Sequence, residues 1–243
     1  MRCSFPPFIF SPSSVPAVST PILQTDDLTR EIDGEVIVDS ATFSVPPSEV
    51  FVVFGPSGAG KSSLLRLLNR LDEPTRGTVR LTGTDYREIP PQTLRRRVGM
   101  VPQQPTLIDG TVADNVGWGA RLRGEPVDDD RVEDLLARLG LDGFALRDAD
   151  DLSGGEAQRV AIARTLYNEP EVVLLDEPAS SLDETAAKQV ESLLGAVMSD
   201  FDLTAVLVTH DTDRARRLGT CGILLNDGRV EAEGDIDAIL RDG

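Results

Sequence analysis

Cysteine and long apolar runs are scarce in this sequence, and each scarcity excludes a class of protein. The 243 residues contain two cysteines, Cys3 and Cys221, whose spacing is not that of a metal site. We therefore expect a reducing compartment rather than a disulfide framework. No apolar run exceeds about five residues, whereas a membrane-spanning helix needs about 20. Any membrane role must therefore involve a partner chain.

Lysine is also scarce: Lys61 and Lys188 are the only two lysines, whereas Arg and Asp are abundant. The net charge of −17 makes general nucleic-acid binding unexpected, since phosphate backbones attract basic side chains. A high-salt cytoplasm and a GC-rich genome both explain this composition. We favour high salt, because codon usage explains Arg in place of Lys better than it explains so large an acidic excess.

The first 21 residues are rich in Pro and Ser, and the apolar Phe8-Ile9-Phe10 is too short for a secretory signal core. We predict a disordered tail at residues 1–21. The 40% hydrophobic content allows the remainder, residues 22–243, to bury the core of one large domain.

A phosphate-binding loop follows the strand-like run Val50–Phe54 and matches the pattern G-x-x-x-x-G-K-[ST] without a mismatch. The residues assigned to nucleotide binding here are Gly55, Pro56, Ser57, Gly58, Ala59, Gly60, Lys61, Ser62 and Ser63. Leucines after Ser63 form a helical face that ends before Pro74, so the loop has the strand and helix that its mechanism requires. Lys61 is expected to contact the terminal phosphates of a nucleotide, and Ser62 to bind Mg²⁺.

A second apolar strand, Val172–Leu175, ends in Asp176 and Glu177. Ligands bind at the carboxyl edge of open α/β sheets, so we expect Asp176 to hold Mg²⁺ with Ser62 and Glu177 to polarise the attacking water. Paired acids at a strand end are also common helix caps, and only the phosphate-binding loop favours the catalytic interpretation.

The remaining pattern predicts an α/β fold with a P-loop NTPase core, an antiparallel β subdomain and an inserted α-helical subdomain at about residues 102–155. The expected strands are 35–38, 42–45, 77–81, 97–101 and 204–209, followed by a hairpin that turns at residues 226–228. The expected helices are 130–139, 160–166, 183–198 and a short one from residue 235.

The stretch Leu152–Arg159 reads Leu-Ser-Gly-Gly-Glu-Ala-Gln-Arg. With the phosphate-binding loop and the Asp176-Glu177 strand, it resembles the ATP-binding subunits of ABC transporters, over about residues 23–242. The resemblance implies that four residues at the start of this stretch face the γ-phosphate of a nucleotide held by the opposite subunit: Ser153, Gly154, Gly155 and Glu156.

The resemblance also implies partners and a location. The partners are a membrane permease, a second copy of the chain or a paralogous ATPase subunit, and an extracytoplasmic solute-binding protein. The location is peripheral, at the cytoplasmic face of the membrane. A free subunit would be cytoplasmic. A soluble ABC-type assembly factor, for example one for iron–sulfur clusters, has the same ATP site without a permease. An ordinary P-loop kinase leaves residues 153–159 unexplained.

Three further positions match the family. Gln103 corresponds to the glutamine that senses Mg²⁺ and the membrane subunit, with its neighbour Gln104 as the alternative. His210 corresponds to the histidine near the γ-phosphate and Glu177. Ser180–Asp183 matches the loop that crosses the dimer interface, although Asp183 is equally suited to cap a helix.

Other positions depart from the family pattern. No aromatic ring stands near Ile32, where the family stacks adenine, so we expect a weaker apolar contact with the base. Ser48 replaces a common turn glycine, and Glu156 a common glutamine. Together with Asn69–Pro74, Glu156 suggests the phosphate-type and related importers of small inorganic solutes.

The composition predicts that folding stability and ATPase activity rise from low salt into the molar range of KCl, because salt screens repulsion among the carboxylates. Thermal unfolding and phosphate release over a KCl series test this. Highest stability at the lowest ionic strength would contradict the high-salt interpretation.

Overall fold

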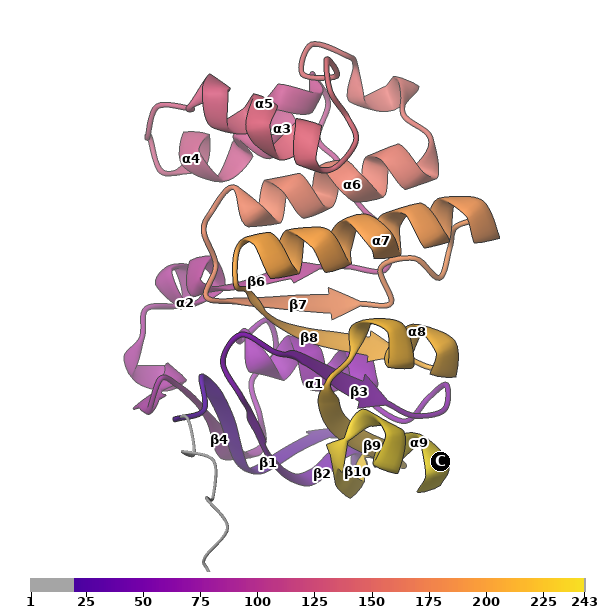
Figure 1. Cartoon of the computed structure of the whole chain (residues 1–243). Coiled ribbons are helices and arrows are strands. Elements are labelled where there is room, and N and C mark those ends of the chain that lie inside the picture. The colour runs from indigo at the N-terminus through magenta and orange to yellow at the C-terminus, as the bar shows by residue number, and fades with distance from the viewer. Residues whose placement is uncertain (1–19, 243) are drawn as a thin grey trace, which may run out of the picture.

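The computed structural model describes residues 20–242, so the predicted tail at residues 1–21 lies almost wholly outside the described part. Two β-sheets and a block of helices form layers (Figure 1). The strands are β1 (Leu23–Ile32), β2 (Glu35–Val45), β3 (Val50–Phe54), β4 (Arg76–Leu81), β5 (Thr84–Asp85), β6 (Val98–Val101), β7 (Val172–Asp176), β8 (Thr204–Thr209), β9 (Cys221–Asn226) and β10 (Arg229–Asp235). The helices are α1 (Lys61–Leu68), α2 (Pro91–Arg97), α3 (Val112–Val116), α4 (Trp118–Leu122), α5 (Asp129–Arg138), α6 (Gly154–Leu166), α7 (Glu184–Asp200), α8 (Thr212–Leu218) and α9 (Ile236–Asp242), with short 3₁₀ turns at Tyr86–Glu88 and Ala149–Asp151.

The larger sheet has six strands in the order β10-β9-β3-β8-β7-β6. All neighbouring pairs are parallel except β10 with β9, which is the hairpin predicted at residues 226–228. Parallel neighbours require crossover connections, and helices supply them on both faces of the sheet. This arrangement is the predicted α/β core.

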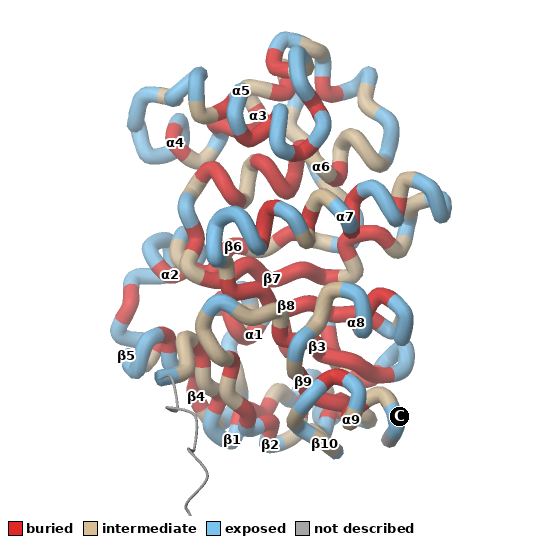
Figure 2. Tube along the Cα trace, in the orientation of Figure 1, coloured by how far each residue is buried: buried red, intermediate tan, exposed pale blue. Residues whose placement is uncertain are grey.

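Successive side chains of the central strands point to opposite faces of the sheet, and each face packs into its own hydrophobic core. In β7, Val173 and Leu175 pack with α6 and α7, whereas Val172 and Leu174 pack on the side of α1. Because both faces are buried, these strands read as continuous apolar runs (Figure 2).

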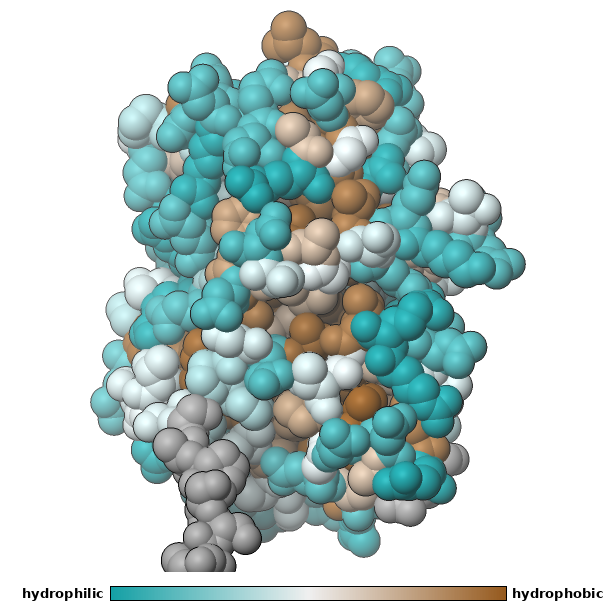
Figure 3. Space-filling model, viewed as in Figure 1, coloured by the Kyte–Doolittle hydropathy of each residue, from teal (hydrophilic) through white to brown (hydrophobic). Residues whose placement is uncertain are grey.

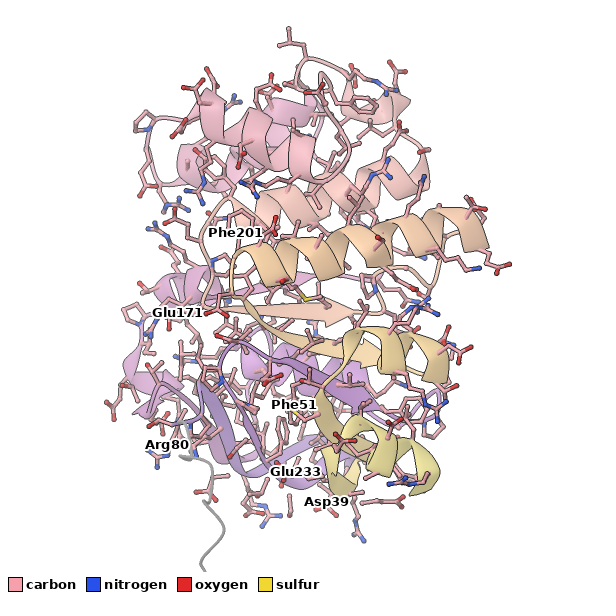
Figure 4. The ribbon with its side chains drawn as sticks, viewed as in Figure 1. Asp39, Phe51, Arg80, Glu171, Phe201 and Glu233 are labelled. Carbon is pink, nitrogen blue, oxygen red and sulfur yellow. The ribbon has the colours of Figure 1, made fainter. Side chains whose placement is uncertain are left out.

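The smaller sheet is antiparallel, in the order β2-β1-β4-β5, and forms the predicted β subdomain. Phe43 of β2 stacks on Phe51 of β3, with ring centroids 5.4 Å apart. Asp39 pairs with Arg229 of β10, and Glu233 accepts the N–H of Ser44 (Figure 4). These contacts join the two sheets at the edge where β2 meets β10.

The sequence-based interpretation was wrong about the first two strands. It named no strand within β1 and divided β2 into two strands. The reason is a pair of irregularities: Asp27 and Ser40 have φ of 51°, and the register between β1 and β2 shifts beside them. Such bulges interrupt the two-residue alternation from which strands are recognised. Helices α2 and α8 were not anticipated either.

The helical layer above the sheet contains α3, α4 and α5, and it packs on α6 (Figure 1). Asp183 caps α7 by accepting the N–H groups of Thr185 and Ala186, so its role as a helix cap is confirmed. The face drawn in Figure 3 is mostly hydrophilic, with hydrophobic side chains gathered across its middle. None of the helices within residues 20–242 combines the length and hydrophobicity needed to cross a membrane.

A buried ion cluster joins α7 to α8. The carboxylate of Glu191 accepts from Nε of Arg214 at 2.6 Å and also from Arg217. Glu191 and Arg214 are 4% and 6% exposed, so each depends on the other for compensation.

Glu191→Ala is predicted to destabilise the fold by roughly 3–5 kcal/mol, because it removes the carboxylate 2.6 Å from the buried guanidinium of Arg214 and leaves that group only the ion pair with Asp211 at 4.0 Å. Glu184→Ala on the same helix is the control, since Glu184 is exposed and pairs with Lys188; its unfolding free energy should hardly change. Urea unfolding measures both, and losses of equal size would argue against a contribution from burial.

Candidate active site

The predicted catalytic residues meet at the carboxyl edge of the six-stranded sheet. Along this edge the phosphate-binding loop follows β3, His210 follows β8, Asp176 and Glu177 end β7, and Gln103 comes two residues after β6. Parallel strands end at the same edge, so the topology gathers segments that are distant in the chain.

A cleft of about 520 Å³ opens at this edge, within the usual size range of ligand sites. Its lining consists of Ile37, Ser57, Gly58, Gly60, Lys61, Ser62, Ser63, Gln103, Glu177 and His210. All of these except Ile37 were predicted from the sequence.

The phosphate-binding loop fits tightly between two backbone segments. Gly60 caps α1 with φ of 92°, and a Cβ there would lie 2.5 Å from the carbonyl oxygen of Ile37. A Cβ on Gly55 would lie 2.0 Å from the carbonyl oxygen of Leu225. Glycine is therefore required at both positions by space, and at Gly60 also by conformation.

Lys61 lies folded against its own loop. Its Nζ donates to the carbonyl oxygens of Gly55 at 2.9 Å and Pro56 at 2.7 Å. Burial lowers the pKa of Lys61, and the carboxylates of Glu177 and Asp176 partly oppose this. The lysine thus lies enclosed at the cleft, close to two acids.

Ser62 and Asp176 are in direct contact, because the Ser62 hydroxyl donates to Oδ1 of Asp176 at 2.9 Å. Burial raises the pKa of Asp176, and Glu177 adds to the rise, while the Ser62 hydrogen bond opposes it. Hydroxyl and carboxylate oxygens suit Mg²⁺, which uses one or two carboxylates together with water and phosphate oxygens. Residues 20–242 contain no cluster of three or more acidic, His or Cys side chains that could hold a metal. The donor set therefore fits a Mg²⁺ ion completed by phosphate.

A hydrogen-bond chain connects the remaining catalytic candidates. Nδ1 of His210 lies 3.0 Å from Oε1 of Glu177. The hydroxyl of Ser180 donates to the carbonyl oxygen of Glu177 and accepts from Nε2 of Gln103, both at 3.0 Å. Glu177 has φ of 45°, unusual for a residue with a side chain, and such conformations cluster at functional sites.

The serine–glycine segment lies apart from this cleft. None of Ser153 to Glu156 is among the described residues that line it, and Ser153 and Gly154 are exposed. Ser153 caps α6, and a Cβ added to Gly154 or Gly155 would lie 3.5 Å from Leu182 or 3.4 Å from Ala186. The predicted residues thus form two groups on one chain, and only the first group lines the cleft.

Two residues that line or connect the site were missed or underrated. Ile37 lines the cleft from β2, at the point where the β1–β2 register shifts between the pairs Glu31–Val36 and Arg30–Val38. Ile32 pairs with Glu35 near the end of the same hairpin. Ser180 was assigned to the dimer loop, but it also links Gln103 to Glu177. No sequence signal identifies either contact, because both depend on strand pairing.

A phosphate-binding loop facing an acidic strand end defines a P-loop ATPase, and the exposed Ser153–Gly155 helix start is a further, distinctive element. Residues 38–180 match the family model described as ABC transporter. The chain belongs to this family.

Similar proteins cover most of the chain. "ABC transporter I family member 17" of Arabidopsis thaliana is 44% identical, over 87% of this chain and 81% of its own length. "Protein STAR1" of Oryza sativa subsp. japonica is also 44% identical, over 88% of this chain but 63% of its own length. "Phosphate import ATP-binding protein PstB 2" of Natronomonas pharaonis is 40% identical, over 88% and 80%.

Solved structures of ABC ATP-binding proteins have the same fold as this chain. CbiO1 from Clostridium perfringens, part of the ABC transporter complex cbiONQ, has a TM-score of 0.83 at 27% identity and covers 92% of both chains. The ATP-binding cassette MJ0796, solved as a dimer bound to ADP and Pi, has a TM-score of 0.77 at 30% identity, covering 88% of this chain and 98% of its own. The predicted fold class is confirmed, and the chain is an ATP-binding ATPase of the class whose subunits dimerise and energise a membrane permease. These matches do not favour the assembly-factor alternative.

Ile32→Tyr is predicted to tighten ATP binding about two- to twelvefold, because a ring at the position where the family stacks adenine adds a stacking term of roughly 0.5–1.5 kcal/mol. Titration calorimetry measures it. Binding of inorganic tripolyphosphate should be unchanged, while Lys61→Ala should abolish the binding of both ligands. Unchanged ATP binding by Ile32→Tyr would show that the base lies elsewhere.

Proposed function

We propose that this chain is the ATP-hydrolysing subunit of an importer, bound at the cytoplasmic face of a membrane permease. Two copies, or one copy with a paralogue, would clamp two ATP molecules. Each ATP would lie between Gly58–Ser62 of one subunit and Ser153–Gly155 of the other. The observation that carries this proposal is the separation of these two segments on a single chain.

The phosphate-binding loop positions the triphosphate. Backbone N–H groups at the start of α1 face the β- and γ-phosphates, and Lys61 exchanges its carbonyl partners in the loop for phosphate oxygens. Ser62 and Asp176 would hold Mg²⁺, with Gln103 nearby, and the ion would neutralise phosphate charge.

Glu177 and His210 act on the attacking water. Glu177 accepts its proton as general base, and His210, within hydrogen-bond distance of that carboxylate, orients Glu177 and the γ-phosphate. Gln103 contacts Ser180 in the loop assigned to the dimer interface, which would connect permease engagement to the catalytic carboxylate.

An extracytoplasmic solute-binding protein would deliver the solute to the permease. The chain is 40% identical both to a phosphate import protein and to a methionine import protein, so identity does not distinguish the solute. Asn69 and Asp72 make contacts that end α1: Asn69 accepts the N–H of Leu71, and Asp72 pairs with Arg66. This segment therefore supports the helix and makes no contact that would read a solute.

Glu177→Gln is predicted to bind ATP, to hydrolyse it at least about a hundredfold more slowly, and to form an ATP-dependent dimer. The amide keeps the shape of the side chain but cannot accept the proton. Size-exclusion chromatography and phosphate release measure the two effects, and the wild type should dimerise only transiently.

Adding Ser153→Arg to Glu177→Gln should dissociate this dimer, because it places a long side chain at the contact with the partner's γ-phosphate. A Glu177→Gln protein that binds ATP, stays monomeric and hydrolyses at the wild-type rate would refute both the general base and the shared site.

A further inference from the structure

The N-terminus of α6 carries a carboxylate in its first turn. Oε2 of Glu156 accepts the N–H of Ser153 at 2.8 Å and the hydroxyl of Ser153 at 2.6 Å, forming a capping box. These hydrogen bonds lower the pKa of Glu156, so the group is ionised at neutral pH. The helix start thus already holds an anion of its own.

This carboxylate conflicts with the role proposed for the segment. A γ-phosphate approaching Ser153 would need the same hydroxyl that Glu156 now holds, and two like charges close together repel. Asp150 and Asp151 lie just before Ser153 and add to the negative charge. A glutamine at position 156 would provide a similar cap without the charge.

Arg147 is the positive group in contact with Glu156. Its Nη1 donates to Oε1 of Glu156 at 3.3 Å, leaving Oε2 to Ser153, and this is the one salt bridge of Glu156 within residues 20–242. Its Nη2 donates to the carbonyl oxygen of Asp151, and its guanidinium lies 4.2 Å from the ring centroid of Phe144. The backbone of Arg147 is fixed by hydrogen bonds to Val112 and Phe144. The charge is therefore held in place beside the helix start.

We propose that Arg147 is a positioning residue for ATP-driven dimerisation, which compensates the charge of Glu156 so that the start of α6 accepts the γ-phosphate held by the partner subunit. This inference rests on the proposed shared site. It assigns to Arg147 a role at the Ser153–Gly155 segment and no role in binding ATP to its own chain.

The test measures the ATP-dependent dimer dissociation constant of full-length Glu177→Gln protein by sedimentation equilibrium. Adding Arg147→Ala should raise the dimer dissociation constant about tenfold. Each of the two shared sites loses one partly exposed ion pair, which is worth roughly threefold in affinity. Adding Glu156→Gln to that variant should restore the dimer, because it removes the uncompensated charge. ATP affinity of the monomer, measured by calorimetry, should be unchanged throughout.

Arg138→Ala is the matched control. Arg138 has the same side-chain exposure of 39%, pairs with Asp134 and lies over the ring of Phe201, which is at the far end of α7 (Figure 4). This variant should leave dimerisation unchanged. Arg147→Gln, which keeps polar contacts without the charge, should weaken the dimer as Arg147→Ala does and replaces it if the alanine variant fails to fold.

The outcomes separate the two proposals. A Glu177→Gln parent that stays monomeric with ATP overturns the shared site and this role with it. A parent that dimerises while Arg147→Ala has no effect overturns the role of Arg147 alone. A defect that Glu156→Gln does not rescue also overturns it, since Arg147 would then act only by holding the Phe144–Asp151 segment in place.

Discussion

The parallel pairing of β3, β8, β7 and β6 is the constraint on which the site depends. Each strand ends at the same edge, so residues as distant in sequence as Ser62 and Asp176 come within 2.9 Å of each other. The strands are buried on both faces, and a shift of one residue would turn Val173 and Leu175 into the opposite core. Hydrophobic packing thus sets the accuracy with which the polar groups are placed.

Charge is distributed differently at the site and on the surface. Most ion pairs use arginine, whose planar group binds carboxylates in a fixed geometry, as in Arg66 with Asp72. The phosphate-binding loop instead uses one of the two lysines, and the compact ammonium of Lys61 fits beneath the carbonyl oxygens of Gly55 and Pro56. The site holds this cation beside two acids.

Helix α6 contacts both halves of the catalytic machinery. The buried side chain of Gln158 donates to the carbonyl oxygen of Pro102, next to Gln103, and a Cβ added to Gly154 would lie 3.5 Å from Leu182 in the loop after β7. A displacement of the helical layer would therefore be felt at both the Gln103 segment and the loop that supports Glu177. This is a physical route by which a partner bound to one part of the chain could affect hydrolysis at another.

The phosphate-binding loop, the Asp176-Glu177 pair and the Ser153–Gly155 helix start were identifiable from sequence, because each is a short contiguous pattern whose chemistry depends on adjacent residues. Strand β1 was missed, because bulges break the alternation that defines a strand. The sequence by itself determined which groups are available for binding and hydrolysing ATP. Only the tertiary structure decided that Ile37 lines the cleft, that Ser180 bridges Gln103 and Glu177, and that Arg147 faces Glu156, since these contacts join residues that local patterns do not relate.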